Sequence, residues 1–415
     1  MKIRIYLAAA ICLAFGPKII AEEEEDTDLG DLGFFSDAKN NLKFGFRLAT
    51  GPKVHFGNLG TVPFPNPIAL PSSGEVDRKY TDGGVIKDSL RITGPQNEAD
   101  SAGRQTSAPG GVYYVTDTNN VTTGPYLSYT PGQTRYWSYS NASQVVALGN
   151  GTGIAMNSYS ATSAGAGFDT KSKYSSGVEL QVERLLGKLG KHWEVNLVAG
   201  LAISTISGNK AGDVQSTLNS VQDIFLLNLQ PDQGIPAAGY IAPTFTALTL
   251  PDNTVVGSGV ETTVPLATVP DATSHRETST PGAANVNGVW KISGAYYIMR
   301  VGPELRAMLT KDISINTSIG FSAAYAGSVY SATESFTVTG VTDPISVSED
   351  SVASKYFSGY YANMDAQWQL NDRAGVFAGV SYESIGNYSQ SVGGRTAKID
   401  LSGTVGVRGG LSIKF

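Results

Sequence analysis

Residues 398–415 read KIDLSGTVGVRGGLSIKF, and this stretch decides how the rest of the chain is interpreted. Its odd-numbered positions, from Ile399 to Phe415, are all apolar or glycine, and its even-numbered positions are polar, charged or glycine. A period of two is typical of a β-strand with one apolar and one polar face. Strands usually run about 5–6 residues, whereas a strand tilted across a bilayer needs about 9–11 residues in the apolar zone. The length of this stretch predicts one membrane-spanning strand.

Seven further segments show the same alternation. They lie at about 42–50, 173–185, 193–204, 290–309, 313–325, 356–370 and 373–383. Long connections at about 51–172, 205–287, 327–354 and 384–397 alternate with short ones. In an antiparallel sheet this order places every tight turn and both chain ends on one side, and every long loop on the other, as in transmembrane barrels. The predicted fold is all-β: a transmembrane antiparallel up-and-down β-barrel of eight strands, or of ten or more if residues 110–140 add strands.

The composition agrees with β-strands and large surface loops. Only 16% of the 415 residues are charged and 48 are glycine, which does not suit a helical enzyme. The tract 149–167, rich in glycine, serine and alanine, is predicted to be a flexible loop. The net charge of −6 gives no reason to expect a nucleic-acid partner.

The first residues have the features of a secretory signal peptide. Lys2 and Arg4 precede an apolar core, and Ala21 stands before an acidic run. Residues 1–21 are therefore predicted to be removed, with 22–41 as a periplasmic lead and 42–415 as a single barrel domain. The only cysteine, Cys12, lies in the predicted signal peptide, so the mature chain is expected to have no disulfide and no thiol chemistry.

Aromatic residues fall near the ends of the predicted strands. Amphipathic aromatic rings concentrate where a barrel meets the lipid headgroups, in two girdles. The predicted girdle residues are Phe44, Trp193, Trp290, Tyr325, Tyr356, Trp368, Tyr382 and Phe415.

These features together resemble bacterial outer-membrane β-barrels, and among them the small eight-stranded OmpA/OmpX type. The final strand, ending in Phe415, resembles the C-terminal signal strand that the assembly machinery of such barrels reads. The resemblance covers the strand residues only, because the large loops depart from the compact members. It implies an outer-membrane location in a Gram-negative-type envelope, with outer-membrane lipid, the barrel assembly machinery and periplasmic chaperones as partners.

Charged residues collect on the inward parity of the predicted strands. The interior of an eight-stranded barrel is just wide enough for side chains to fill it, and a buried charge is costly unless it is paired. A structural ion-pair plug is therefore favoured over a gated ion path. The predicted network comprises Lys43, Arg47, Glu179, Glu183, Glu194, Arg300, Glu304, Arg306, Asp365, Arg373 and Arg408.

Histidine is too sparse to support catalysis or metal binding. The three histidines are His55, His192 and His275, and only His55 is predicted at the outer rim, where a lipid-modifying enzyme would need a serine and an acidic or amide partner beside it. No cluster of histidine or cysteine has the spacing of a metal site. The chain is expected not to be an enzyme and to hold no cofactor or metal.

The predicted function is that of an outer-membrane anchor and scaffold for surface-exposed loops with a structural or recognition role. The tyrosine, asparagine, serine and glycine content of the loops suits an adaptable surface for an unknown extracellular ligand. The alternatives are a porin-like diffusion channel for small solutes and, third, a rim-active lipid-modifying enzyme that uses His55.

Overall fold

The computed structural model describes residues 39–66, 76–86, 132–134, 136–172, 174–190, 192–229, 234–240 and 264–415, together with four short strands between these ranges. Within them, every regular element is a β-strand except one 3-10 turn at Ala142–Gln144. None of the described residues forms a helix with the length and hydropathy needed to cross a membrane. The predicted signal peptide and residues 22–38 of the predicted lead lie outside the described residues.

Eight strands of a ten-stranded antiparallel sheet close into a ring, because β12 pairs with β1 on one side and with β13 on the other. The prediction of an all-β antiparallel barrel is confirmed: seven predicted segments lie on strands of this ring, and the eighth, 398–415, contributes its second part, β23. The ring strands are β1 (Asn40–Thr50), β12 (Tyr174–Leu189), β13 (Trp193–Leu226), β17 (Arg276–Met308), β18 (Ile313–Phe336), β19 (Ile345–Gln369), β20 (Ala374–Ser384) and β23 (Thr404–Lys414).

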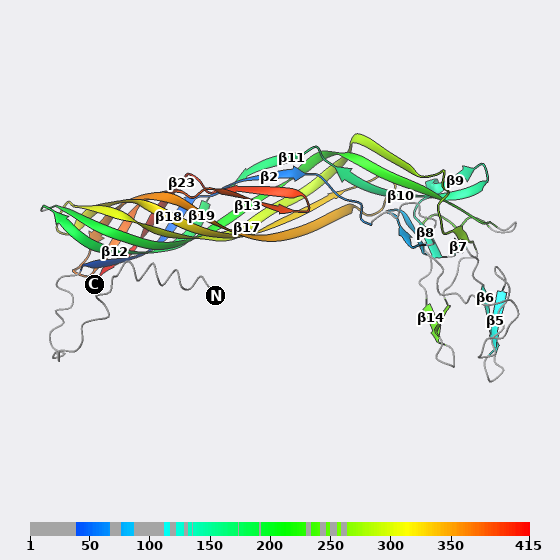
Figure 1. The fold of residues 1–415 in the computed structure, drawn as a ribbon, viewed down its shortest axis with the longest axis horizontal. Coiled ribbons are helices and arrows are strands. Elements are labelled where there is room, and N and C mark those ends of the chain that lie inside the picture. Colours follow the sequence, from blue (N-terminus) through cyan, green and yellow to red (C-terminus); the bar gives the residue numbers. More distant parts are fainter. Residues whose placement is uncertain are drawn as a thin grey trace.

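The tight turns and the C-terminus lie together at one end of the ring (Figure 1). Asn40 and Phe415 exchange backbone hydrogen bonds of 3.1 and 3.0 Å where the first strand meets the last. At the other end, four ring strands continue far beyond the barrel: β13 has 34 residues, β17 has 33, β18 has 24 and β19 has 25. The prediction of loops at 205–287 and 327–354 is therefore wrong over 205–226, 276–287, 327–336 and 345–354, which are strand.

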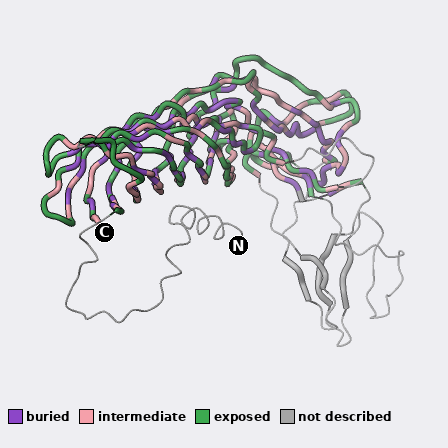
Figure 2. The backbone as a smooth tube through the Cα atoms, turned by 60° about the vertical axis from the view of Figure 1, so that its left-hand side comes forward, coloured by how far each residue is buried: buried purple, intermediate pink, exposed green. Residues whose placement is uncertain are grey.

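A second sheet packs against these extensions. It consists, in spatial order, of β11 (Ala166–Lys171), β2 (Lys53–Leu59), β22 (Arg395–Asp400) and β21 (Asn387–Val392). The side chains buried between the two sheets are mostly apolar, and Phe56 stacks on Tyr330 with ring centroids 5.6 Å apart. Buried and exposed residues alternate along the strands here (Figure 2). We call the second sheet the inner sheet. The stalk is the sandwich that this inner sheet forms with residues 205–217, 280–298, 324–336 and 345–358.

The single strand predicted at 398–415 is two strands, β22 in the stalk and β23 in the ring. The chain turns at 401–403, where Gly403 has a φ of 66° and Asp400 accepts hydrogen bonds from the N–H and hydroxyl of Ser402. The period of two continues through this turn, so alternation alone could not reveal the break.

The far end of the molecule is a packed head, formed by the described residues of 76–86, 132–157, 218–229 and 264–275. Its apolar core surrounds Trp137, which is fully buried and donates its indole N–H to the carbonyl of Val264 at 3.0 Å. The flexible loop predicted at 149–167 is wrong, because β10 pairs with β13 there. The strands of this region are β3 (Arg78–Lys79), β4 (Gly83–Ile86), β7 (Gln133–Thr134), β8 (Tyr136–Tyr139), β9 (Val145–Leu148), β10 (Gly151–Thr162) and β16 (Leu266–Ala267), with separate hairpins β5 (Val112–Thr116)–β6 (Thr122–Leu127) and β14 (Thr246–Thr249)–β15 (Val255–Ser258).

Candidate functional site: the barrel wall, its lumen and the head

The long strands exchange their apolar and polar faces partway along their length. In the ring part of β17, Arg300, Glu304 and Arg306 are buried and their outward neighbours are apolar. Higher on the same strand the apolar Trp290 and Ile292 are buried, and polar residues face outward. Because a strand keeps its parity, this exchange means that the surroundings change: an apolar medium around the ring and water around the stalk.

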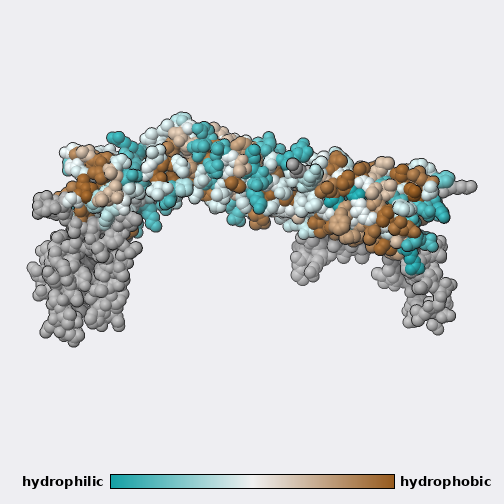
Figure 3. All heavy atoms as spheres, turned by 180° about the vertical axis from the view of Figure 1, so that it is seen from behind, coloured by the Kyte–Doolittle hydropathy of each residue, from teal (hydrophilic) through white to brown (hydrophobic). Residues whose placement is uncertain are grey.

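Apolar side chains accordingly cover the outside of the ring as a band, and on the face seen in Figure 3 they gather at the ring end of the molecule. Its outward side chains include Phe46 and Phe321, which are 67% and 79% exposed. A monomeric protein in water rarely exposes a contiguous apolar patch of more than a few hundred Å², so this band calls for lipid. Further band residues are Leu48, Val178, Leu180, Met299, Val301, Leu305, Ile319, Met364, Val380, Val405, Val407, Leu411 and Ile413.

Seven of the eight predicted girdle residues lie on the outward face of the ring strands. Four of them lie toward the turn end of the ring, and their exposed fractions are 42–56%: Phe44, Trp193, Trp368 and Phe415. Toward the stalk, Tyr325 lies 4.7 Å from Tyr356 and 6.5 Å from Tyr297, and Tyr382 lies 6.1 Å from Tyr360, measured between ring centroids. The prediction omits Tyr297 and Tyr360, although both have the outward parity.

The prediction that Trp290 belongs to a girdle is wrong. Its side chain is fully buried in the stalk, and its indole N–H donates a hydrogen bond of 2.8 Å to Glu334. Trp290 shares the even parity of Arg300, and that parity is buried at nearly every position from Ala284 to Arg306 of β17. Its distance from the turn suggested a girdle, whereas its parity already placed it inside.

The lumen holds a lower layer of charged side chains near the turn end. Lys43 Nζ lies 2.5 Å from Glu183 Oε1 and 2.9 Å from Asp365 Oδ2. Arg306 binds the other oxygen of Glu183 at 2.5 Å and approaches Glu304 at 3.5 Å. These residues come from four strands of the ring, β1, β12, β17 and β19, so the layer connects its opposite walls.

A second layer lies above the first. Glu383 receives both terminal nitrogens of Arg47, at 3.2 and 2.7 Å, and also pairs with Arg300. Arg300 lies 3.3 Å from Glu179, whose other oxygen is 2.7 Å from Arg408 Nε. The prediction omits Glu383, although its parity on β20 marks it as inward.

The two layers together are electrically balanced. They contain five cations, Lys43, Arg47, Arg300, Arg306 and Arg408, and five carboxylates, Glu179, Glu183, Glu304, Asp365 and Glu383, all at most 7% exposed. Phe377 and Tyr361 are buried beside these charges, with the Phe377 ring centroid 5.5 Å from Lys43 Nζ and 5.2 Å from the Arg408 guanidinium. Such a layer leaves no surplus charge to attract an ion.

Two members of the predicted network lie outside these layers. Glu194 is at the turn-end mouth, 3.6 Å from Arg306, with a side chain 20% exposed. Arg373 lies in the exposed turn just before β20. It therefore does not belong to the buried layers. A polar cavity of about 350 Å³ opens at this mouth and reaches inward to Glu183 and Arg306.

The head contains a second buried polar centre. Asp223 is 1% exposed and accepts a hydrogen bond from the Tyr80 hydroxyl at 2.5 Å, while its other oxygen lies 2.8 Å from His275 Nδ1. The hydrogen bond with Asp223 raises the pKa of His275, and burial raises the pKa of Tyr80. A groove of about 410 Å³ runs beside Tyr80, between the head and 341–346.

His55 lies on the stalk surface just beyond the ring. Its Nδ1 is 2.8 Å from Asp169, and the two side chains are 53% and 88% exposed. No hydroxyl of the described residues is hydrogen-bonded to His55, and no group of three metal-ligating side chains occurs among them. His192 lies in the turn before β13, where its carbonyl accepts from the N–H of Met308.

No family model matches the chain. No curated protein matches it either. Among solved structures it is similar to the outer membrane protease OmpT from Escherichia coli, at 9% identity over 91% of this chain and 98% of that one, with a TM-score of 0.27. It is also similar to the attachment invasion locus protein Ail of Yersinia pestis, at 11% identity over 63% and 93% of the two chains, with a TM-score of 0.21.

Proposed function

We propose that this chain is an outer-membrane β-barrel of the small eight-stranded type that anchors a water-exposed stalk and head. The observation that carries the proposal is the exchange of apolar and polar faces at one level of the long strands. Below that level Phe321 is exposed and Ser322 buried, and above it Ser331 faces outward while Tyr330 is buried. The stalk and head then stand outside the cell, and their described grooves offer surfaces for an extracellular ligand.

The lumen supports an anchor rather than a diffusion channel. Its two layers balance five cations against five carboxylates, and the stalk core closes the space above them. Removing charges from water is costly unless they are paired, and paired charges hold one another in place. The barrel is therefore plugged, and the refolded protein is expected to give no stable stepwise current in a planar lipid bilayer. Large stepwise currents would overturn the plug and favour the porin-like function.

The membrane placement is tested by cysteine labelling, because the only cysteine of the sequence lies in the predicted signal peptide. Thr317→Cys and Thr333→Cys form a matched pair: both replace an exposed threonine on the outward face of β18. In protein reconstituted into phosphatidylcholine vesicles, a water-soluble maleimide is expected to label position 333 rapidly and position 317 at least about tenfold more slowly, because lipid covers the ring. Both positions are expected to react equally after unfolding in urea. Equal labelling in vesicles would overturn the proposal.

A further inference from the structure

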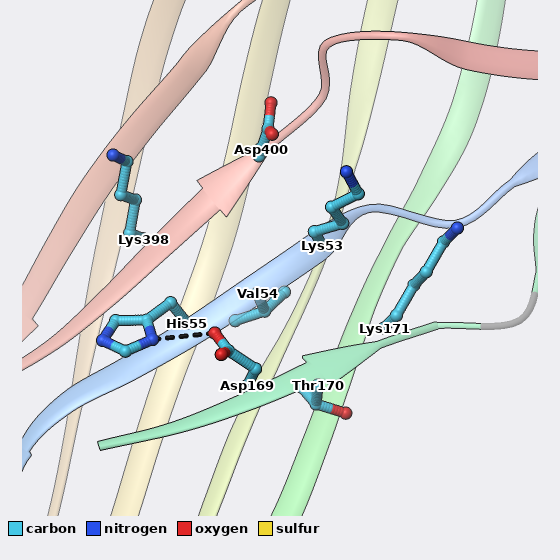
Figure 4. Close-up of a pocket in the computed structure, with 8 residues that line it drawn as sticks. All are labelled: Lys53, Val54, His55, Asp169, Thr170, Lys171, Lys398 and Asp400. Carbon is cyan, nitrogen blue, oxygen red and sulfur yellow. Dashed lines mark hydrogen bonds and ion pairs between the residues drawn. The ribbon is translucent and has the colours of Figure 1, made fainter. Parts of the chain in front are cut away.

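Three lysines surround a groove on the stalk surface, next to the ring. The groove has a volume of about 440 Å³ and is lined by Lys53 of β2, Lys171 of β11 and Lys398 of β22 (Figure 4). Lys53 stands directly opposite Lys171 on one side and Asp400 on the other, and Lys398 stands opposite His55. Like charges in directly opposite positions of a sheet destabilise it, so this arrangement calls for a counter-charge.

The two carboxylates of the groove, Asp169 and Asp400, offset only part of the charge of the three lysines. Asp169 is engaged by His55 at 2.8 Å, and Asp400 accepts hydrogen bonds from Ser402. Within the described residues, none of the three lysines has a carboxylate oxygen within 4.0 Å of its ammonium group. In a chain with a net charge of −6, three such ammonium groups in one groove mark a binding surface for an anion.

The height of the groove indicates which anion. The apolar band ends near Thr50, which pairs with the exposed Tyr174. Lys53 and Lys171 each lie three residues beyond this pair, which is about 10 Å along a strand and less along a tilted barrel axis. The polar layer of a bilayer adds about 5–8 Å to each side of the hydrocarbon core. Lys53 and Lys171 therefore reach the level of the lipid headgroups. Lys398, opposite His55, lies two residues farther from the band, and its flexible stem extends the reach of its charge.

We propose that this groove binds the phosphate of a lipid headgroup in the outer leaflet, with Lys53, Lys171 and Lys398 as the contacting residues. The inference rests on the proposed membrane placement and adds a ligand to it. Lysine ammonium groups serve as point charges for phosphate, and basic residues at a membrane surface add attraction to anionic lipids roughly one by one. A headgroup held there fixes the stalk against the membrane plane.

The test measures lipid retention. Wild-type protein is reconstituted into phosphatidylcholine vesicles with a minor fraction of phosphatidic acid, transferred to a neutral detergent, and examined by native mass spectrometry for bound lipid. The triple variant Lys53→Gln/Lys171→Gln/Lys398→Gln is expected to retain at least about tenfold less phosphatidic acid than the wild type. The charge-matched control Lys188→Gln/Lys291→Gln/Lys311→Gln, whose residues do not line the groove, is expected to retain it fully. Equal retention by both triple variants would overturn the proposal.

Two further measurements keep the outcomes separate. Heat-modifiable migration on a gel checks that each variant is folded, so that a loss of lipid is not a loss of structure. The labelling pair on β18 tests membrane placement independently: protection at position 317 with no lipid preference would defeat this inference alone. Displacement of phosphatidic acid by millimolar inorganic phosphate would show a site for free phosphate and would also defeat it.

Discussion

The indole N–H of Trp290 donates a hydrogen bond to Glu334 across 2.8 Å, and both side chains are fully buried between the two sheets of the stalk. The same carboxylate accepts the backbone N–H of Gly60 at 2.9 Å and pairs with Arg395 at 2.9 Å. Glu334 thus joins a ring strand, β18, to the inner sheet. One buried carboxylate holds the two layers of the stalk in register.

Replacing Glu334 by alanine is expected to loosen the stalk, because it leaves the guanidinium of Arg395 buried beside one remaining carboxylate. Breaking a buried pair in this way costs about 3–5 kcal/mol. The measurement is the rate of tryptic cleavage after Arg395 in reconstituted protein, compared with the wild type. Glu349→Ala is the control: Glu349 contacts the same arginine, but its side chain is 39% exposed, so its loss is expected to cost less than about 1 kcal/mol. Equal cleavage rates of the two variants would show that Glu334 does not hold the two layers of the stalk together.

In the lumen, Glu383→Ala is expected to open the plug. Arg47 and Arg300 both pair with this carboxylate, and without it two buried cations repel each other and draw in water. We expect brief, anion-selective current events in a planar bilayer and a lower urea midpoint, with no such events in the wild type. Arg373→Ala, on the exposed turn, is the control and is expected to leave both quantities unchanged. A silent, fully stable Glu383→Ala variant would show that the upper layer does not close the lumen.

The head is expected to lose stability as the pH rises. The hydrogen bond with Asp223 raises the pKa of His275 above its usual value. Its stabilisation is therefore fully present below the unfolded-state pKa of about 6.5 and is lost as the pH rises through the higher pKa of the folded head. Hydrogen exchange of the segment around Asp223, corrected for the intrinsic rate, is expected to accelerate across this range.

The histidine variants assign that effect. His275→Gln is expected to flatten the pH dependence, whereas His192→Gln, at the opposite end of the molecule, is expected to leave it intact. If His275→Gln keeps the wild-type slope, another group controls the head.

Deleting Phe415 is expected to lower the yield of assembled, heat-modifiable barrel in the outer membrane several-fold. The deletion removes both backbone hydrogen bonds between Phe415 and Asn40, which fasten the seam between the last strand and the first. Phe46→Ala is the control, because Phe46 is 67% exposed on the band but lies away from the chain end. Normal assembly without Phe415 would contradict the signal-strand interpretation.

The barrel could be predicted from sequence because its outward face is a run of large apolar residues on alternate positions. Val405, Val407, Leu411 and Ile413 are all at least 50% exposed, and each stands two or four residues from the next. The charged inward positions were recognisable from the same parity. Alternation reports which residues share a face, and a composition of large apolar side chains makes that face conspicuous.

The stalk and head could not be predicted in the same way. On β13 beyond residue 205, the alternation is carried by glycine, serine, asparagine and an occasional valine, and it resembles loop sequence. The buried face also changes identity: Ile399 is fully buried, whereas Val405, of the same parity, is 53% exposed. The period of two shows which residues share a face of the strand. It does not show whether that face meets lipid, water or a protein core, because that depends on the surroundings of the strand. The head depends on contacts between segments far apart in sequence, such as Tyr80 with Asp223.

The exchange of faces marks the level at which the surface of the molecule changes from apolar to polar. Tyr297, Tyr325 and Tyr356 stand side by side on three neighbouring strands at the level where the exchange occurs. Moving the protein deeper into the bilayer by two residues of strand would bury polar stalk residues in the hydrocarbon core. Moving it outward by the same distance would expose the apolar band to water. Each ångström of such mismatch costs a fraction of a kcal/mol, and the cost is shared around the whole circumference. With the ring in a bilayer as we propose, the head is held at a fixed height above the membrane, and bilayer thickness, more than any hinge, sets how far it reaches.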